Sequence, residues 1–226
     1  MSKIEQMILD RDFKYLRPCF YNNKWALRCE LGIGADEEFA KNAKRRATEI
    51  YNILFPQGAD AIIFNYWFTD YSTDGPAHLD GYGDTDVAER MKYILDYEFD
   101  QLRFLLEHEA QYRHLTLRSL PTDELYVDIK IDGGLPLRHR VICYSDGREF
   151  DTYDIIDRQI GETFGHDISF VSFENECILS IYDSRGCDIV FATQEKMKEF
   201  YHTLEPYFLD YDRAEMERRY KENENV

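Results

Sequence analysis

Acidic and basic side chains with catalytic potential gather in one short stretch, Asp183-Ser184-Arg185-Gly186-Cys187-Asp188. The same residue types return near the carboxyl end, in Asp210-Tyr211-Asp212-Arg213. Carboxylates beside an arginine can act as general acid and base on an anionic substrate. They can equally form a structural ion pair, because the planar guanidinium of arginine bonds carboxylates through two hydrogen bonds. The candidate catalytic residues are Asp183, Arg185, Asp188, Asp212 and Arg213.

Nucleophilic catalysis at Cys187 would need a neighbouring histidine as base. Only His166 and His202 lie close to it in the sequence, and no serine nucleophile turn is found in the chain. Two interpretations of the cluster therefore stay open. In one, Arg185 pairs with a carboxylate and holds this stretch against the tail. In the other, the cluster is an acid/base site.

A β-hairpin is expected to position the cluster. Apolar runs at Ile178–Tyr182 and Ile189–Phe191 flank the polar residues. Gly186 is expected to supply a backbone angle that other residues resist. A helix over 194–205, with Thr193 as its N-cap, and a final helix over 207–221 would then carry the tail back to the hairpin.

The rest of the chain predicts an α+β fold. Alternating residues predict a strand at Trp25–Leu31 with one face in water, and helical spacing follows over 36–54. Ala59–Phe68 reads as a buried central strand. We expect an antiparallel or mixed sheet covered mainly on one side by helices. The pattern fits two lobes, an α/β lobe over 1–110 and a strand-rich α+β lobe over 111–226. It fits a single domain as well.

Three patterns begin like cofactor sites, and each departs from its motif. Gly32-Ile33-Gly34 lacks the third glycine of a dinucleotide loop and precedes acidic residues that would repel a phosphate. Asp70–Gly75 begins like a calcium loop, but Gly81 stands where the bidentate glutamate belongs. His108-Glu109 is followed by Tyr112, where a zinc site needs its second histidine. We predict no cofactor and no metal.

Charge indicates the kind of partner. The 226 residues include 44 acids and 27 bases, for a net charge of −17. Such a chain is poorly suited to nucleic acid or to an anionic membrane, and it favours a basic protein. Acidic and aromatic residues are dense between residues 60 and 100. The predicted partner-binding residues there are Tyr66, Trp67, Asp70, Tyr71, Asp74, Asp80, Tyr82, Asp84 and Asp86.

The cysteines and the apolar runs indicate the compartment. Five cysteines, an odd number without a C-x-x-C pair, predict reduced thiols. The opening residues have no apolar signal core, and no apolar run reaches the length of a membrane span. We therefore expect a cytoplasmic protein.

Several segments resemble a bacterial family catalogued as a domain of unknown function. The family pattern combines a tyrosine, acids and Arg-Gly-Cys-Asp with a Leu-Leu-Asp-Tyr-Asp-Arg-like tail, and here it is matched by Ile181–Ile189 and Phe208–Arg213. Leu31–Gly34 before a helix and the aromatic strand at Asn65–Asp70 also match. Ser184 stands where family members usually carry a second acid. The resemblance implies no activity, but it does imply a small cytosolic accessory protein, of a kind that can protect a cell against its own toxins.

Two functions from different classes remain open. The first is an acidic cytosolic protein-interaction module, as in an immunity-type inhibitor that binds a basic toxin or another basic protein. The second is a small enzyme that uses the Asp/Arg cluster on an anionic substrate. The charge and the lack of a complete catalytic motif favour the first.

Overall fold

The computed structural model describes residues 3, 6, 19–70, 113–114, 137–161 and 168–222. The chain forms two compact units, one made of residues 1–64 with 145–226 and the other of residues 65–144. The lobe boundary expected near residue 110 falls outside the described residues, so the division into 1–110 and 111–226 stays a prediction.

An antiparallel sheet forms the centre of the first unit. Its strand order is β1 (Ala26–Glu30), β7 (Gly186–Phe191), β6 (Cys177–Asp183), β5 (Ile168–Ser172) and β2 (Ala61–Asp70). Each of these four neighbouring pairs is antiparallel. Strands β6 and β7 are joined by a two-residue turn, which confirms the predicted hairpin.

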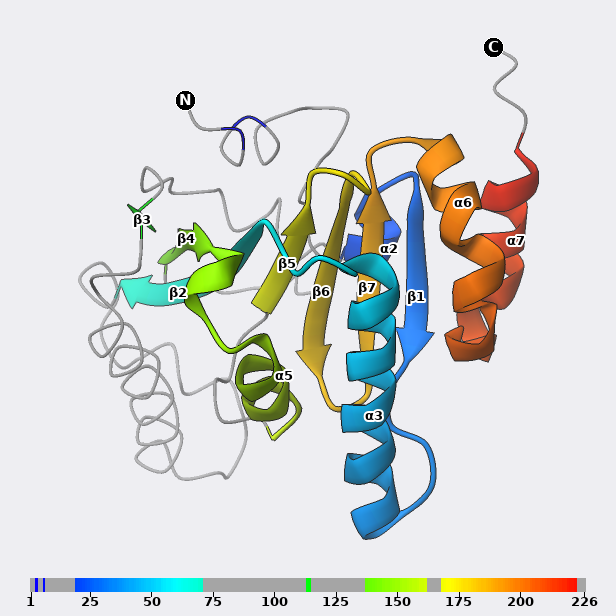
Figure 1. Cartoon of the computed structure of the whole chain (residues 1–226), viewed down its shortest axis with the longest axis horizontal. Coiled ribbons are helices and arrows are strands. Elements are labelled where there is room, and N and C mark those ends of the chain that lie inside the picture. Colours follow the sequence, from blue (N-terminus) through cyan, green and yellow to red (C-terminus); the bar gives the residue numbers. More distant parts are fainter. Residues whose placement is uncertain are drawn as a thin grey trace. The chain divides into compact units, whose positions relative to one another are not determined.

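Two helices, α3 (Asp36–Leu54) and α5 (Thr152–Ile160), cover one face of this sheet (Figure 1). Strand alternation gives that face a buried apolar row across all five strands. The ring of Tyr51 on α3 meets Phe170 of that row edge-on, with centroids 5.1 Å apart. The row consists of Leu27, Ile189, Leu179, Phe170 and Ile62. The expected α+β fold, with the sheet covered mainly on one side by helices, is confirmed.

The outer edge of β1 is covered rather than wet. Helices α6 (Gln194–Leu204) and α7 (Arg213–Lys221) lie beyond this edge, and α2 (Cys19–Asn22) lies on the sheet face opposite α3 (Figure 1). The backbone N–H of Leu209 donates to the carbonyl of Arg28 at 3.1 Å, and the N–H of Arg28 donates to Met216 Sδ at 3.2 Å. The prediction that one face of this strand lies in water is wrong, because the Arg28 side chain is only 12% exposed.

Thr193 caps helix α6. Its Oγ1 accepts the N–H of Lys196 at 3.2 Å, so the predicted N-cap of α6 is confirmed.

The covered edge of β1 explains where the last helix begins. The predicted helix over 207–221 starts only at Arg213, after two 3₁₀ turns, η5 (Glu205–Tyr207) and η6 (Asp210–Asp212). Phe208 bridges to Cys29 on β1, so the chain there is extended and cannot be helical.

Gly186 is required for space and not for its backbone angle. Among the described residues, the glycines with positive φ are Gly34 and Gly58. A Cβ on Gly186 would lie 2.1 Å from the Tyr182 hydroxyl and 2.8 Å from the carbonyl oxygen of Cys29. The expected reason for this glycine is therefore wrong, and close approach between strands replaces it.

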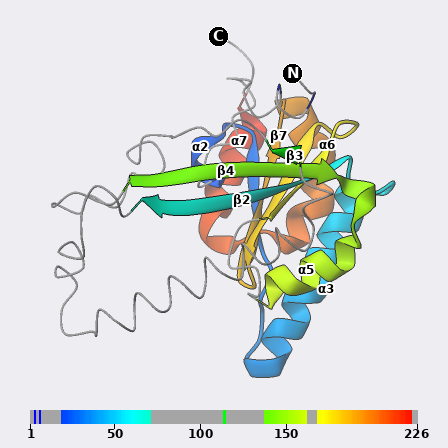
Figure 2. The same ribbon diagram turned by 90° about the vertical axis from the view of Figure 1, so that its left-hand side faces the viewer.

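In the second unit, the far part of β2 lies beside β4 (Leu137–Asp146), as Figure 2 shows. Strand β3 (Arg113–His114) pairs with β4 in antiparallel register. A 3₁₀ turn, η4 (Gly147–Glu149), follows β4 in the first unit. None of the helices in the described ranges is long and apolar enough to span a bilayer.

Candidate functional site

Asp188 lies at the centre of the predicted catalytic cluster and is buried. It sits on β7 directly opposite Arg28 of β1, and 3% of its surface is exposed. Arg28 donates to it twice, from Nε to Oδ1 at 2.8 Å and from Nη2 to Oδ2 at 3.2 Å. The backbone N–H of Phe20 donates to Oδ2 at 2.9 Å. This carboxylate is therefore neutralised and hydrogen-bonded inside the protein.

Asp212, from the tail, reaches the same arginine. Its Oδ2 accepts from Arg28 Nη1 at 3.3 Å, and its Oδ1 accepts from the Tyr21 hydroxyl at 3.5 Å. Asp212 is only 6% exposed. Arg28, Asp188 and Asp212 form what we name the buried ion-pair cluster, and it joins the hairpin to the tail.

The surroundings of Arg28 keep it charged. Its guanidinium carbon lies 4.9 Å from the Phe20 ring centroid and 4.6 Å from that of Tyr21. Burial alone would lower the pKa of Arg28, but the hydrogen bond and the charge of Asp188 raise it above its ordinary value. Burial, together with the charge of Asp188, also raises the pKa of Tyr182, which keeps that phenol neutral.

The other predicted catalytic residues form separate local pairs. Arg185 donates from its backbone N–H to Asp183 Oδ1 at 2.7 Å and from Nε to Oδ2 at 2.9 Å. Its side chain is 77% exposed. Arg213 Nε donates to Asp210 Oδ1 at 3.0 Å. In the described contacts, Arg28 therefore links the hairpin to the tail. This corrects the expectation that Arg185 forms that link.

The arrangement is suited to holding the fold. A general acid or base needs a carboxyl group that can exchange its proton with a substrate. Both carboxylates of the buried ion-pair cluster instead accept hydrogen bonds from Arg28 and from its neighbours, in a site nearly closed to solvent. Within the described ranges, no group of three acidic, histidine or cysteine side chains is placed to hold a metal ion.

Cys187 cannot act as a nucleophile in this state. It is fully buried and faces Cys29 across the β1–β7 pair. Burial is the main cause that raises the pKa of Cys187 well above its ordinary value, and the hydrogen bond with Cys29 raises it further. His202 is bound to Tyr220 and Glu205 on the surface, and His166 lies outside the described residues.

We expect the buried thiols to resist alkylation in the native protein. Burial raises the pKa of Cys177 to about 12, and only the thiolate reacts. Iodoacetamide at pH 8 should therefore label Cys19, Cys29, Cys177 and Cys187 only after denaturation in urea. Peptide mapping by mass spectrometry measures each site separately. Rapid labelling of Cys187 in the folded protein would contradict the burial described here.

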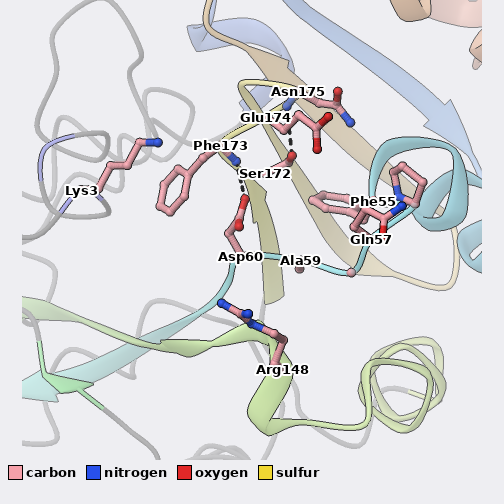
Figure 3. A pocket seen from close by; sticks show the side chains of 12 residues that line it. Lys3, Phe55, Gln57, Ala59, Asp60, Arg148, Ser172, Phe173, Glu174 and Asn175 are labelled. Carbon is pink, nitrogen blue, oxygen red and sulfur yellow. Dashed lines mark hydrogen bonds between the residues drawn. The ribbon is translucent and has the colours of Figure 1, made fainter.

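A second candidate site is an open cavity of about 500 Å³ where β2 begins and β5 ends (Figure 3). The Phe173 N–H donates to Asp60 Oδ2 at 2.6 Å, and Asn175 Nδ2 donates to the carbonyl of Leu54 at 2.7 Å. The lining side chains combine opposite charges with aromatic rings, namely Lys3, Phe55, Asp60, Arg148, Phe173 and Glu174. No motif or spacing in the sequence indicates this site.

The structure does not describe the side chain of any predicted partner-binding residue. Tyr66, Trp67 and Asp70 lie on β2, but their side chains are not described. The other predicted partner-binding residues, Tyr71, Asp74, Asp80, Tyr82, Asp84 and Asp86, lie outside the described residues. Their role in partner binding stays a prediction.

Fold and site together define an α+β protein in which two of the predicted catalytic carboxylates, Asp188 and Asp212, belong to an internal ion-pair cluster. The chain belongs to the family described as Domain of unknown function (DUF3885), which matches residues 6–212. No curated protein and no solved structure matches it significantly.

Proposed function

We propose that this protein is a bacterial, cytoplasmic protein-interaction module that binds a basic protein, in the manner of an immunity-type inhibitor of a basic toxin. The observation that carries the proposal is the net charge of −17. So large an imbalance creates a field that attracts basic partners and raises their association rates.

The internal ion pairs support this proposal in a second way. Bases in the described part of the first unit commonly pair with acids of the same chain, as Arg28 does with Asp188 and Lys44 with Asp157. Each such pair cancels one positive and one negative charge, so the net charge of −17 stays on acids outside these pairs. This negative charge is available to a partner, and it includes exposed carboxylates such as that of Glu37.

Exposed tyrosines near the tail supply contact area of the kind found at interfaces. Tyr211 is 86% exposed and Tyr21 is 56% exposed. The Tyr21 ring is held over Arg28, and its hydroxyl donates to Asp212, so it would lose little conformational entropy on binding. Tyrosine is enriched among residues that dominate binding energy.

Affinity capture tests the proposal. The tagged full chain is incubated with a lysate of its native host at low salt, and the retained proteins are identified by mass spectrometry. We expect a basic protein to be retained by the wild type and depleted with a variant that changes Asp70, Asp74, Asp80 and Asp84 to Asn. If the retained protein is a toxin, co-expression with this chain should restore growth. Retention of acidic or neutral proteins alone would contradict the proposal.

A further inference from the structure

The cavity between the start of β2 and the β5–β6 turn has a rigid wall that carries a carboxylate. Asp60 Oδ2 accepts from the Phe173 N–H, which fixes the side chain. Among the described residues, no hydrogen bond is formed with the second oxygen of Asp60. The wall continues through Asn175, whose N–H is bonded to Ser172 Oγ and whose side chain is bonded to the carbonyl of Leu54. A carboxylate held in this way is preorganised to accept a donor.

An aromatic ring lines the same cavity and already binds a cation. Lys3 Nζ lies 4.1 Å from the centroid of the Phe173 ring, within the range of a cation–π contact (Figure 3). Phe173 is partly exposed. Lys3 therefore shows that the face of this ring accommodates the ammonium group of a lysine.

The charges around the cavity favour a cation over an anion once Lys3 is displaced. Asp60 and the exposed Glu174 contribute two negative charges. Arg148 contributes one positive charge, but its Nε lies 3.3 Å from Asp146 Oδ1, which offsets that charge. Without Lys3 the lining is therefore net negative beside an aromatic face.

We propose that this cavity receives the side chain of a lysine or arginine from the basic partner, which displaces Lys3. The incoming ammonium or guanidinium lies over Phe173 and donates to the second oxygen of Asp60. The volume of about 500 Å³ is ample for one such side chain. The proposal rests on the proposed function, because it assigns one contact of the same basic partner.

Small model compounds test the cavity without the partner. The full chain, labelled with ¹⁵N, is titrated with the N-acetyl methylamides of lysine, arginine, norleucine and glutamate, and amide chemical shifts are followed by NMR. We expect the lysine and arginine compounds to produce saturable shifts at Phe173, Glu174 and Asn175. The norleucine and glutamate compounds should produce none there.

Three variants identify the groups responsible. Phe173→Leu should weaken binding of the lysine compound by about fivefold, since it removes the cation–π contact and keeps an apolar side chain. Asp60→Asn should weaken it while keeping an acceptor for the Phe173 N–H. Lys3→Ala should strengthen it, because it removes the competing ammonium. Glu217→Gln, an equal change of charge on α7, is the control and should leave binding unchanged.

Three results would overturn the proposal. The first is binding of the glutamate compound alone, which would make Lys3 and Arg148 an anion site. The second is binding of the norleucine compound as strong as that of the lysine compound, and the third is no shift with any compound. These results leave affinity capture of a basic partner unaffected, so failure of the cavity is distinguishable from failure of the proposed function. If such a partner is captured, its affinity should fall with Phe173→Leu. An unchanged affinity would overturn the cavity assignment alone.

Discussion

Replacing Arg28 by Met is expected to lower the free energy of unfolding by about 3–5 kcal/mol. The change leaves Asp188 and Asp212 buried without the guanidinium that neutralises both. Removing one partner of a buried ion pair costs more than the pair itself contributes, because an uncompensated charge stays in a medium that solvates it poorly. Urea denaturation followed by circular dichroism measures the change.

Arg185→Met is the matched control for that experiment. Arg185 also bonds a carboxylate, but its side chain is largely exposed, so we expect a change within about 0.5 kcal/mol. Adding Asp188→Asn to Arg28→Met should recover part of the loss by removing one buried charge. Equal effects of the Arg28 and Arg185 changes would show that burial of the cluster is not what stabilises the hairpin against the tail.

Replacing Arg219 by Met is expected to cost about 3 kcal/mol or more. Its Nη1 donates to three backbone carbonyls, at 2.9 Å to Phe20, 3.2 Å to Asn23 and 3.1 Å to Ala26. Arg219 thereby ties α7 to the segment that leads into β1. Methionine can fill a similar volume, but it leaves these carbonyls without their charged donor.

Arg218→Met is the control on the same helix. Arg218 bonds Glu215, as Arg219 does, but it contacts none of these carbonyls and its side chain is mostly exposed. Its replacement should change the free energy of unfolding by less than about 1 kcal/mol. Thermal or urea melts of the two variants that coincide would contradict the role given to Arg219.

Elements with regular hydrophobic patterns were predictable from the sequence. The hairpin of β6 and β7, helix α3 and the cap at Thr193 all appear where periodicity and capping chemistry place them. These features depend on residues close together in the chain. Local patterns therefore suffice to predict them.

The edge of β1 was not predictable, because its cover comes from far along the chain. Alternation of Leu27, Arg28 and Cys29 is typical of a strand with one wet face. The Phe20 and Tyr21 rings of α2, together with Asp212, cover the guanidinium of Arg28. Leu209 and Met216 bond the backbone edge of the same strand. The same contact delays the last helix until Arg213, although helical spacing begins earlier.

The carboxylates of the candidate site were predictable from the sequence, but the arginine that joins them was not. Asp188 and Asp212 were grouped as candidates from the sequence, and the structure brings both to one cation. Arg28 was missed, because its only local signal is an opposite charge that could face Asp188 across an antiparallel pair. The cavity lined by Lys3, Asp60 and Phe173 draws on three distant segments, and no spacing rule joins them.

The salt dependence of association with the captured basic partner shows whether the acidic chain attracts that partner through its charge. Between about 0.01 M and 0.1 M salt the Debye length falls from about 30 Å to about 10 Å, so steering by exposed charge weakens. We predict that the association rate of the wild type falls steeply as salt rises over this range. At low salt, a variant in which Asp70, Asp74, Asp80 and Asp84 are changed to Asn should associate more slowly than the wild type. The dissociation rate should change less. An association rate that responds neither to salt nor to these four changes would show that the acidic residues do not attract the partner.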